Sequence, residues 1–556
     1  MAKRKYNSMA EVPEHLKEKL KRYFTNVGGN TFVITGLPHE LTGGALARYS
    51  RASTGMQLTI VNEFLDESGE PSQEKGTEIM DRILNAFGDD SVGELEGAHV
   101  GIENISQLGT KFIEDRRIGG SPIEQSTRYV KYDQKDDQGR WRYLRPPEIV
   151  ISSLLPSFEA VNNRAFEVYS EGVSRLTEHF KGEFPREKFQ IEGERDKEKV
   201  RLYERELQTE EEERAFKNSY NFTVRCAALD VGRCVLPSST LTHIGLFGNG
   251  RFFTNILSFM KSSELKEANQ RGSDLERELN KVIPTFIKRN AANPKPAEIN
   301  RNMRKMAYEL FSEIKPQDDR VTLVKRSDHI DEVIASSLFP YTDVSLQQTI
   351  NRVEQLPAEK KMQILETYKG AREVRRDRTG RGLEAGYPLT FDLVGGFAEY
   401  RDLERHRMLT QQRQNLTTEL GFIMPPEMGI VGLEKEVEEV VVRMENLNRD
   451  IKQAGLYETS QYATLFNHRI RFMLGMNLRE LQHLTELRTQ KAGHFSYRGM
   501  TMEMARKAIE QYPWAETFLR FVDYSDPDNR ISRAKEQSRI AGKNLAKGID
   551  ASLDLQ

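Results

Sequence analysis

Apolar and polar residues follow one another along this chain mainly at helical spacing. Apolar side chains recur three and four positions apart in the segments 14–23, 94–112, 157–228, 391–403 and 479–488. This periodicity predicts amphipathic helices. Two short segments, 31–35 and 321–324, are rich in β-branched residues and predict strands instead. The pattern therefore predicts an α+β protein that is rich in helix.

Two features of the pattern divide the chain. Residues 290–320 contain Asn293-Pro294-Lys295-Pro296, which is typical of a linker. A chain of 556 residues is too long to fold around a single hydrophobic core. We therefore expect two halves, 1–300 and 301–556, each a small mixed sheet packed with long helices. The segment 192–213 is mostly charged, and it predicts a helical insertion at about 180–215 that forms a solvated or partner-facing arm. Beyond Asp526 the polar tail predicts a loosely docked helix.

The composition favours a globular protein of a reducing compartment. The chain is 37% apolar and 30% charged, with 82 basic against 84 acidic residues, so no basic excess favours nucleic-acid binding. No apolar run reaches membrane-spanning length, and no secretory signal follows Met1, so we expect a cytoplasmic protein without membrane partners. Cys226 and Cys234 lack metal-ligand spacing and predict buried, small apolar side chains, with no metal site.

A cluster of basic residues is the main candidate for chemistry. Glu404-Arg405-His406-Arg407 is followed by the amides and guanidinium of residues 410–415. Like charges repel one another, so such a cluster favours an anion, and a phosphate or pyrophosphate matches the arginine fork. The alternative is an exposed basic turn of an ordinary helix.

The two halves share an order of motifs. Arg116-Arg117-Ile118 in the first half corresponds to Arg405-His406-Arg407 in the second. Asn249-Gly250-Arg251 corresponds in the same way to Asn477-Leu478-Arg479. This order indicates duplication with divergence. The alternative is coincidence among helical arginines.

These motifs resemble those of the flavin-dependent thymidylate synthases, as a tandem, fused version of that family. The family's Arg-His-Arg triplet stands at Arg405-His406-Arg407, and its Glu-x-Ser-x-Arg-Tyr motif at Glu124-Gln125-Ser126-Thr127-Arg128-Tyr129. Its Arg before Val-Leu-Pro corresponds to Arg233, and its later Leu-Arg pair to Leu487-Arg488. The resemblance covers most of both halves in outline and is specific at these motifs.

Each half departs from the family pattern, and the departures are complementary. The second half has Asn415 where the family has serine, and Gln461 where it has the first arginine. The first half has lost the histidine of the triplet and carries Phe259-Met260 in place of Leu-Arg. The resemblance therefore implies one composite site assembled from both halves, with the mirror-image site degenerate. The alternative is a binding or scaffolding module in which both sites have decayed.

The resemblance implies a role for each matched residue. Arg488 would be the catalytic residue that faces the pyrimidine, where charge develops during methylation. The nucleotide dUMP would be bound by Glu124, Gln125, Ser126, Arg128, Tyr129 and Arg233. The cofactor FAD would be bound by Arg405, His406, Arg407, Asn477 and Asn249.

The resemblance also implies co-substrates and an assembly. NADPH would reduce the flavin, and methylenetetrahydrofolate would supply the carbon. Two fused chains would pair as a homodimer that mimics the family's tetramer. A non-catalytic flavin- or nucleotide-binding homologue and a flavoenzyme with another pyrimidine or carbon donor remain the alternatives.

Overall fold

The computed structural model of the chain describes most, but not all, of its residues. These are residues 6–49, 52–66, 68–71, 93–116, 118–196, 198–287, 301, 318–325, 330–338, 346–369, 381–385 and 389–548. Arg117 and most of the expected linker at 290–320 lie outside them. Among the described helices, none is both long and apolar enough to cross a membrane.

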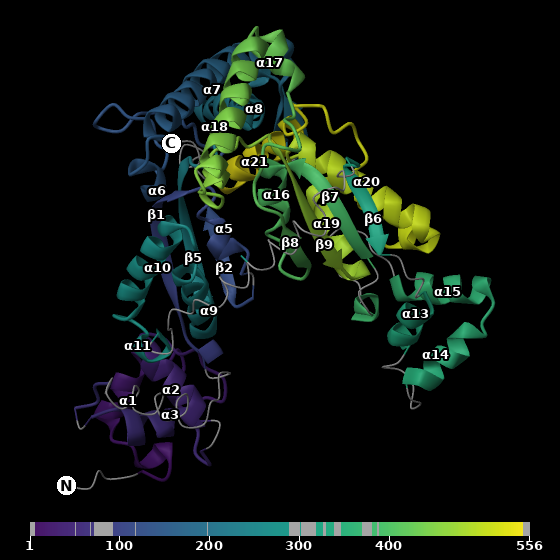
Figure 1. Cartoon of the computed structure of the whole chain (residues 1–556). Coiled ribbons are helices and arrows are strands. Elements are labelled where there is room, and N and C mark those ends of the chain that lie inside the picture. Colours follow the sequence, from purple (N-terminus) through teal and green to yellow (C-terminus); the bar gives the residue numbers. More distant parts are fainter. Residues whose placement is uncertain are drawn as a thin grey trace. The chain divides into compact units, whose positions relative to one another are not determined.

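The chain forms two compact units (Figure 1). Unit 1 comprises Met1–Gln125, Pro146–Glu148 and Leu241–Ile314. Unit 2 comprises Ser126–Arg145, Ile149–Thr240 and Lys315–Gln556. Much of the first half of the sequence therefore belongs to the same unit as the second half. The division into related halves at residue 300 is a statement about ancestry and stays a prediction.

Unit 1 is a three-stranded sheet with helices and a helical N-terminal part. Its strands are β1 (Gly97–Ser106), β2 (Gly120–Glu124) and β5 (Leu241–Asn249). Its helices are α1 (Glu14–Leu20), α2 (His39–Tyr49), α3 (Met56–Thr59), α5 (Lys111–Glu114), α9 (Gly250–Lys261), α10 (Lys266–Leu279) and α11 (Pro284–Ile287). The short helix α6 (Pro147–Val150) begins in unit 1 and ends in unit 2. Apolar residues of β1, β5, α9 and α10 form one buried core, and the first 65 residues form a second one.

Unit 2 contains a four-stranded sheet, a hairpin and long helices. Its strands are β3 (Ile191–Arg195), β4 (Glu198–Leu202), β6 (Val321–Lys325), β7 (Leu389–Gly396), β8 (Thr410–Arg413) and β9 (Arg469–Met476). Its helices are α7 (Leu155–Glu183), α8 (Glu210–Gly232), α13 (Ile330–Leu338), α14 (Leu346–Glu354), α15 (Ala358–Lys369), α16 (Phe397–Leu403), α17 (Pro426–Ile430), α18 (Glu434–Gln453), α19 (Leu478–Arg488), α20 (Phe495–Gln511) and α21 (Ala534–Lys547). Helix α7 packs against both α8 and α18 (Figure 1).

The two main sheets repeat one topology. In unit 1 the strand order is β1-β5-β2, and in unit 2 it is β6-β7-β9-β8. In both, the third strand of the repeat lies between the first and the second, and all described pairs are antiparallel. Each central strand leads into a helix, α9 or α19, whose first turn is capped by an asparagine. The α+β fold with two related halves is thus confirmed, and its described sheets are antiparallel rather than mixed.

Two equivalent segments of the halves also pair with each other inside unit 2. Pro237 and Leu465, which stand equally far beyond Arg233 and Gln461, form an antiparallel bridge. The amide of Ser238 donates to the Thr464 carbonyl at 2.8 Å, and the amide of Phe466 donates to the Leu236 carbonyl at 2.9 Å. Such reciprocal contacts are the signature of two-fold symmetry. They indicate that the halves associate here as two subunits of a symmetric dimer do.

Two predicted helices begin as strands. Residues 97–106 form β1 inside the segment 94–112, and residues 389–396 form β7, which overlaps the start of the segment 391–403; helical spacing had favoured both segments as helices. Both strands pair with partners far along the sequence, β5 and β9, and β7 is buried along most of its length. Periodicity cannot separate a buried strand from a buried helix, and the long-range pairing decides.

The charged insertion is a hairpin rather than a helix. Strands β3 and β4 pair in antiparallel register, with Asp196 at the turn in the left-handed backbone region (φ 53°). Ile191 and Leu202 are buried, so an apolar anchor holds a charged ribbon. The C-terminal α21, expected to dock loosely, packs against β3 and α8.

Other expectations have a mixed outcome. Strand 321–324 is confirmed as β6, and helix 479–488 as α19. Residues 31–35 form only an isolated bridge between Ile34 and Phe24. Cys226 and Cys234 are free and buried, as predicted.

Candidate functional site

The site begins with Arg128, which lies just beyond β2 in the sequence and belongs to unit 2. Its Nε and Nη2 donate to the two carboxylate oxygens of Asp230 on α8, both at 2.7 Å. Its Nη1 donates to the Ala492 carbonyl at 3.4 Å and to the Tyr497 hydroxyl at 3.3 Å. Burial alone would raise the pKa of Asp230, but the Arg128 guanidinium lowers it to about 2. The ion pair is therefore fully charged at neutral pH.

A second pair of arginines meets at Thr127. Arg233, at the end of α8, donates from Nη1 to the Thr127 hydroxyl at 3.2 Å. Arg401, on α16 in the second half of the sequence, approaches the same oxygen at 3.5 Å. Arg233 Nη2 also lies 3.7 Å from Asp402 Oδ2. Residues from both halves of the sequence therefore converge within unit 2.

This cluster carries an excess of positive charge. Burial alone would raise the pKa of Asp402, but Arg405, Arg233, Arg488 and Arg128 together hold it well below its usual range. Arg128 and Arg233 also act on Asp230, and Arg401 meets Arg233 at Thr127, so five guanidiniums lie in a cluster with two carboxylates. Among the described residues, Nε and Nη2 of Arg233 have no hydrogen-bond acceptor, although Arg233 is only 3% exposed. Buried donors normally find partners, so an anionic ligand would complete the cluster.

The histidine of the basic triplet contacts the candidate catalytic arginine. His406 follows α16, and its Nδ1 lies 2.8 Å from Glu480 Oε1 on α19. Nε of Arg488, at the C-terminal end of α19, donates to Nε2 of His406 at 3.0 Å. Burial first, and Arg488 second, hold the pKa of His406 well below its usual value. The imidazole is therefore neutral.

Tyr497, on α20, connects the two arginine groups. Its ring lies 5.6 Å from the Arg488 guanidinium and 6.0 Å from that of Arg128, while its hydroxyl accepts from Arg128. Next to it, Nε2 of His494 lies 3.1 Å from the Asp230 carbonyl. Burial holds the pKa of His494 well below its usual value. An aromatic ring and a neutral imidazole thus line the junction between Arg128 and Arg488.

The remaining predicted residues of unit 2 lie around this junction. The Ser126 hydroxyl accepts from the Arg128 amide at 3.2 Å and so shapes the turn that presents Arg128. Tyr129 is 41% exposed, and its hydroxyl accepts from Nη1 of Arg533 at 3.2 Å. Arg405 and Arg407 are exposed on either side of the buried His406. Their exposure suits contact with a ligand from solvent.

The predicted asparagines have structural contacts. Asn477 Oδ1 accepts from the Glu480 amide at 2.9 Å, and Asn249 Oδ1 accepts from the Phe252 amide at 2.8 Å. Both are N-caps, which stabilise a helix by about 1 kcal/mol. Their predicted role in binding the cofactor stays a prediction.

Glu124, Gln125 and Asn249 belong to unit 1. Glu124 is buried at the end of β2, with Lys111 Nζ at 3.8 Å and the Thr110 hydroxyl at 3.3 Å. Lys111, completely buried, also pairs with Glu114. The Gln125 amide donates to the His243 carbonyl at 2.9 Å, which extends the pairing of β2 with β5. The contacts described for Glu124 and Gln125 are therefore made within unit 1.

The mirror-image position in unit 1 has lost its polar groups. Met260, which stands where the second half has Arg488, is completely buried in the apolar core of unit 1. Arg116, the counterpart of Arg405, stacks on Phe259 at 4.1 Å. The second member of that triplet, Arg117, lies outside the described residues. A sulfur side chain in an apolar core cannot donate hydrogen bonds to a substrate.

The sequence reasoning missed several residues of the site, among them Asp230, Arg401, Asp402, Glu480, His494 and Tyr497. Asp230 interrupts the apolar run Ala227–Val231 of α8, and a lone acidic residue in an apolar helix indicates a buried partner. Asp402 stands three residues before Arg405 at the end of α16. Glu480 and Tyr497 have no comparable signal, because their contacts are made only in the folded chain.

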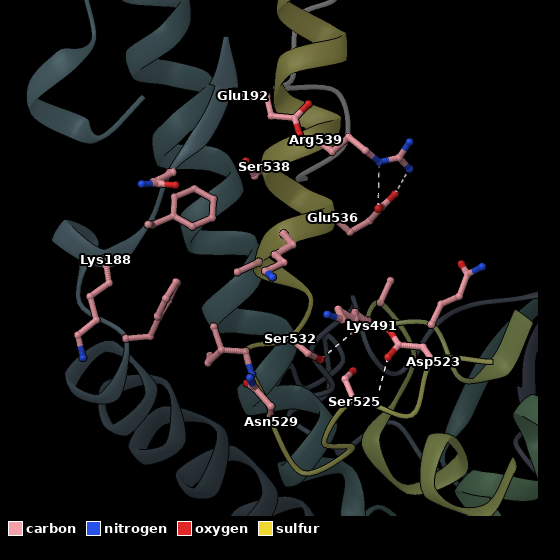
Figure 2. Close-up of a pocket in the computed structure, with 18 of the residues that line it drawn as sticks. Lys188, Glu192, Lys491, Asp523, Ser525, Asn529, Ser532, Glu536, Ser538 and Arg539 are labelled. Carbon is pink, nitrogen blue, oxygen red and sulfur yellow. Dashed lines mark hydrogen bonds and ion pairs between the residues drawn. The ribbon is translucent and has the colours of Figure 1, made fainter. Parts of the chain in front are cut away.

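A cavity of unit 2 has a volume of about 830 Å³. Figure 2 shows Glu192 of β3 next to α21 near Arg539, with Lys491, Asp523 and Ser525 lower in the view and Lys188 at the left. None of the predicted site residues lines it. Ala492, whose carbonyl accepts from Arg128, is part of its wall. The hairpin, through Glu192 and Arg201, therefore forms part of the wall of this cavity together with α21.

Comparison with known proteins identifies relatives over nearly the whole chain. The sequence profile of the family described as thymidylate synthase complementing protein matches residues 42–285 and 344–514. A UPF0159 protein of Chlamydia muridarum is 34% identical over 544 residues, covering 94% of this chain and 97% of its own. A UPF0159 protein of Thermoplasma acidophilum is 31% identical over 509 residues, covering 90% of this chain and 99% of its own. The two matched segments contain the two sets of motifs.

Proposed function

We propose that this chain, which belongs to the thymidylate synthase complementing protein family, is a flavin-dependent thymidylate synthase. Family membership supports a thymidylate synthase-type activity. The finer proposal is the reductive methylation of dUMP to dTMP with reduced FAD and methylenetetrahydrofolate, at one composite site per chain. NADPH would be the reductant of the flavin.

One observation carries this proposal: the arginine cluster is built from both halves of the sequence. Thr127, Arg128 and Arg233 come from the first half, and Arg401, Asp402 and Arg488 from the second. The excess of guanidinium groups and the unsatisfied donors of Arg233 favour a dianionic phosphate, as dUMP carries. The loss of the same groups at Met260 and Phe259 favours a single site.

The residues divide naturally between nucleotide and flavin. Arg233, Arg128 and the Ser126 turn would hold the nucleotide phosphate. The Nε of Arg488 is held by His406, which leaves its terminal amino groups to face the pyrimidine ring. A fixed cation beside O4 or N3 would stabilise charge that develops when C5 is methylated.

The basic triplet fits a flavin dinucleotide. Arg405 and Arg407 are exposed, and their guanidiniums suit the pyrophosphate. His406 is buried and neutral, and Glu480 and Arg488 engage both of its nitrogens, so it would meet the ring system with an uncharged imidazole face. When bound, FAD would supply the reducing equivalents, and methylenetetrahydrofolate the carbon. Two such chains would associate as a homodimer.

The purified protein tests this proposal by its absorbance. We expect a flavin spectrum that responds to added dUMP, and dTMP formation when NADPH and methylenetetrahydrofolate are supplied. A protein that takes up no FAD would overturn the proposal. Flavin binding without any response to dUMP would contradict the substrate assignment.

A second candidate function is a flavin- or nucleotide-binding homologue without this activity. It is favoured by the ion pair of Arg128 with Asp230, which engages the arginine fork that dUMP would need. If dUMP binds, it must share or displace Asp230. Binding of dUMP without formation of dTMP would favour this second candidate. A tighter binding of dUMP to Asp230→Asn than to the wild type would show that the nucleotide competes with the carboxylate.

A further inference from the structure

Glu480 stands at the third position of α19, three residues after the capping Asn477. A glutamate at this position often turns back to the amide of the capping residue. Here its Oε1 instead lies 2.8 Å from Nδ1 of His406, a residue from a different segment. Both side chains are buried, each in a residue only 5% exposed. The carboxylate of Glu480 therefore pairs with His406 rather than with the amide of Asn477.

The hydrogen bonds of His406 determine its tautomer. An arginine guanidinium can only donate, so Nε2 of His406, which receives Nε–H of Arg488 at 3.0 Å, must carry a lone pair. The single proton of the neutral imidazole is then on Nδ1 and is donated to Glu480. The direction of both bonds follows from the chemistry of Arg488 alone.

The electrostatics agree with this arrangement. Burial and Arg488 hold the pKa of His406 well below its usual value, so the ring stays neutral. Burial raises the pKa of Glu480 to about 7, against the opposing effects of His483, Arg479 and Arg488. In either protonation state of Glu480, an oxygen that accepts from Nδ1–H is present.

The first half of the sequence carries other residues at all three positions that correspond to Glu480, His406 and Arg488. The position of Glu480 corresponds in the first half to Phe252, whose amide is capped by Asn249 as that of Glu480 is by Asn477. Phe252 is 1% exposed in the core of unit 1. The half with Phe252 carries Met260 in place of Arg488 and Arg117 in place of His406. If Glu480 served only to begin a helix, the first half would not differ from the second in all three positions at once.

We propose that Glu480 is a positioning residue that holds His406 as its Nδ1–H tautomer and thereby aligns Arg488 toward the substrate. The consequence for turnover rests on the proposed function, whereas the tautomer does not. Without an acceptor at position 480, the buried Nδ1–H would lack a partner, and the ring would turn or move its proton to Nε2. Arg488 would then lose the lone pair that receives its Nε–H.

The experiment compares Glu480→Ala and Glu480→Gln with the wild type. Protein with ¹⁵N-labelled histidine is examined by NMR, and the His406 signals are assigned from their loss in His406→Asn. We expect a proton on Nδ1 in the wild type and in Glu480→Gln, which retains an amide oxygen, and a different pattern in Glu480→Ala. Orienting partners of metal-binding histidines are worth ~10- to 100-fold, so we expect turnover in Glu480→Ala to fall at least about tenfold, mainly in kcat.

Glu486→Ala is the matched control, because Glu486 is also a buried glutamate of α19 but accepts from the Phe521 amide at 3.2 Å. It should leave the His406 signals unchanged. A proton on Nε2 of His406 in the wild type would overturn the proposal, as would an unchanged tautomer in Glu480→Ala. If no flavin or dUMP is bound, the proposed function fails, and the tautomer measurement still decides the role of Glu480.

Discussion

Arg128 and Asp230 form a two-bond ion pair, with both nitrogen-to-oxygen distances at 2.7 Å. One residue comes from the turn after β2, and the other from the last turn of α8. The pair is charged at neutral pH because Arg128 lowers the pKa of Asp230 to about 2, and it is largely shielded from solvent. The pair fixes the position of Arg128, a residue of the first half of the sequence, next to Ala492 and Tyr497 of the second half.

Replacing Asp230 by asparagine should destabilise unit 2 and change its response to acid. Removing one partner of a buried ion pair costs about 3–5 kcal/mol, because the other charge is left uncompensated. The pKa of Asp230 is lowered to about 2 in the folded chain, below about 3.9 in the unfolded chain. Its stabilisation is therefore present above about pH 4 and is lost as pH falls toward 2. Urea denaturation from pH 6 to 2 should show a smaller acid dependence in Asp230→Asn, and equal pH slopes would contradict the assignment.

Substitutions in the two halves should have unequal effects on activity. Arg488→Ala removes the cation that would face the pyrimidine, and loss of such a donor costs ~10²- to 10³-fold in kcat. Arg116→Ala, at the position that corresponds to Arg405, removes only a stacking contact with Phe259 and should lower activity less than about twofold. The measurement is dTMP formation at saturating dUMP. Comparable losses in both variants would show that the site is not assembled as proposed.

The raised pKa of Glu480 predicts that the folded chain loses stability as the pH rises toward neutral. Burial raises this pKa to about 7, whereas an unfolded glutamate titrates near about 4.3. The folded state therefore holds the proton more tightly, and stability falls as pH rises from about 4 to 7. Glu480→Gln should remove up to ~4 kcal/mol of this fall, measured as the difference in unfolding free energy between pH 4 and 8. A wild-type pH dependence that persists unchanged in Glu480→Gln would exclude this carboxyl as its source.

Arg498 should be essential for the loop that follows α20. This arginine is completely buried, and it donates to the Thr489 carbonyl at 2.9 Å and to the Ser525 hydroxyl at 3.1 Å. In Arg498→Met these buried acceptors lose their donor, at ~1–3 kcal/mol each, so we expect a loss of about 3 kcal/mol. Glu510→Gln is the control, since Glu510 is exposed on the same helix. The unfolding midpoint in urea should fall in the first variant and stay within error in the second.

Local signals were sufficient for some elements and not for others. The helix of residues 479–488 and the strand of residues 321–324 were predictable because their residues favour one local structure. The strands β1 and β7 were mistaken for helices because both are stabilised by pairing with strands that follow much later. The hairpin at 191–202 was hidden by its charge, because only Ile191 and Leu202 anchor it.

The sequence by itself determined that two related halves carry complementary remnants of one set of motifs, because residue types and their spacing are written in the chain. It also identified Arg128, Arg233, Arg405, His406 and Arg488 as candidate site residues. Only the tertiary structure decided which carboxylates and rings meet these cations: Asp230, Asp402, Glu480 and Tyr497. Hydrogen bonds and ion pairs act over a few ångströms, so partners distant in sequence are chosen by folding and by no pattern along the chain.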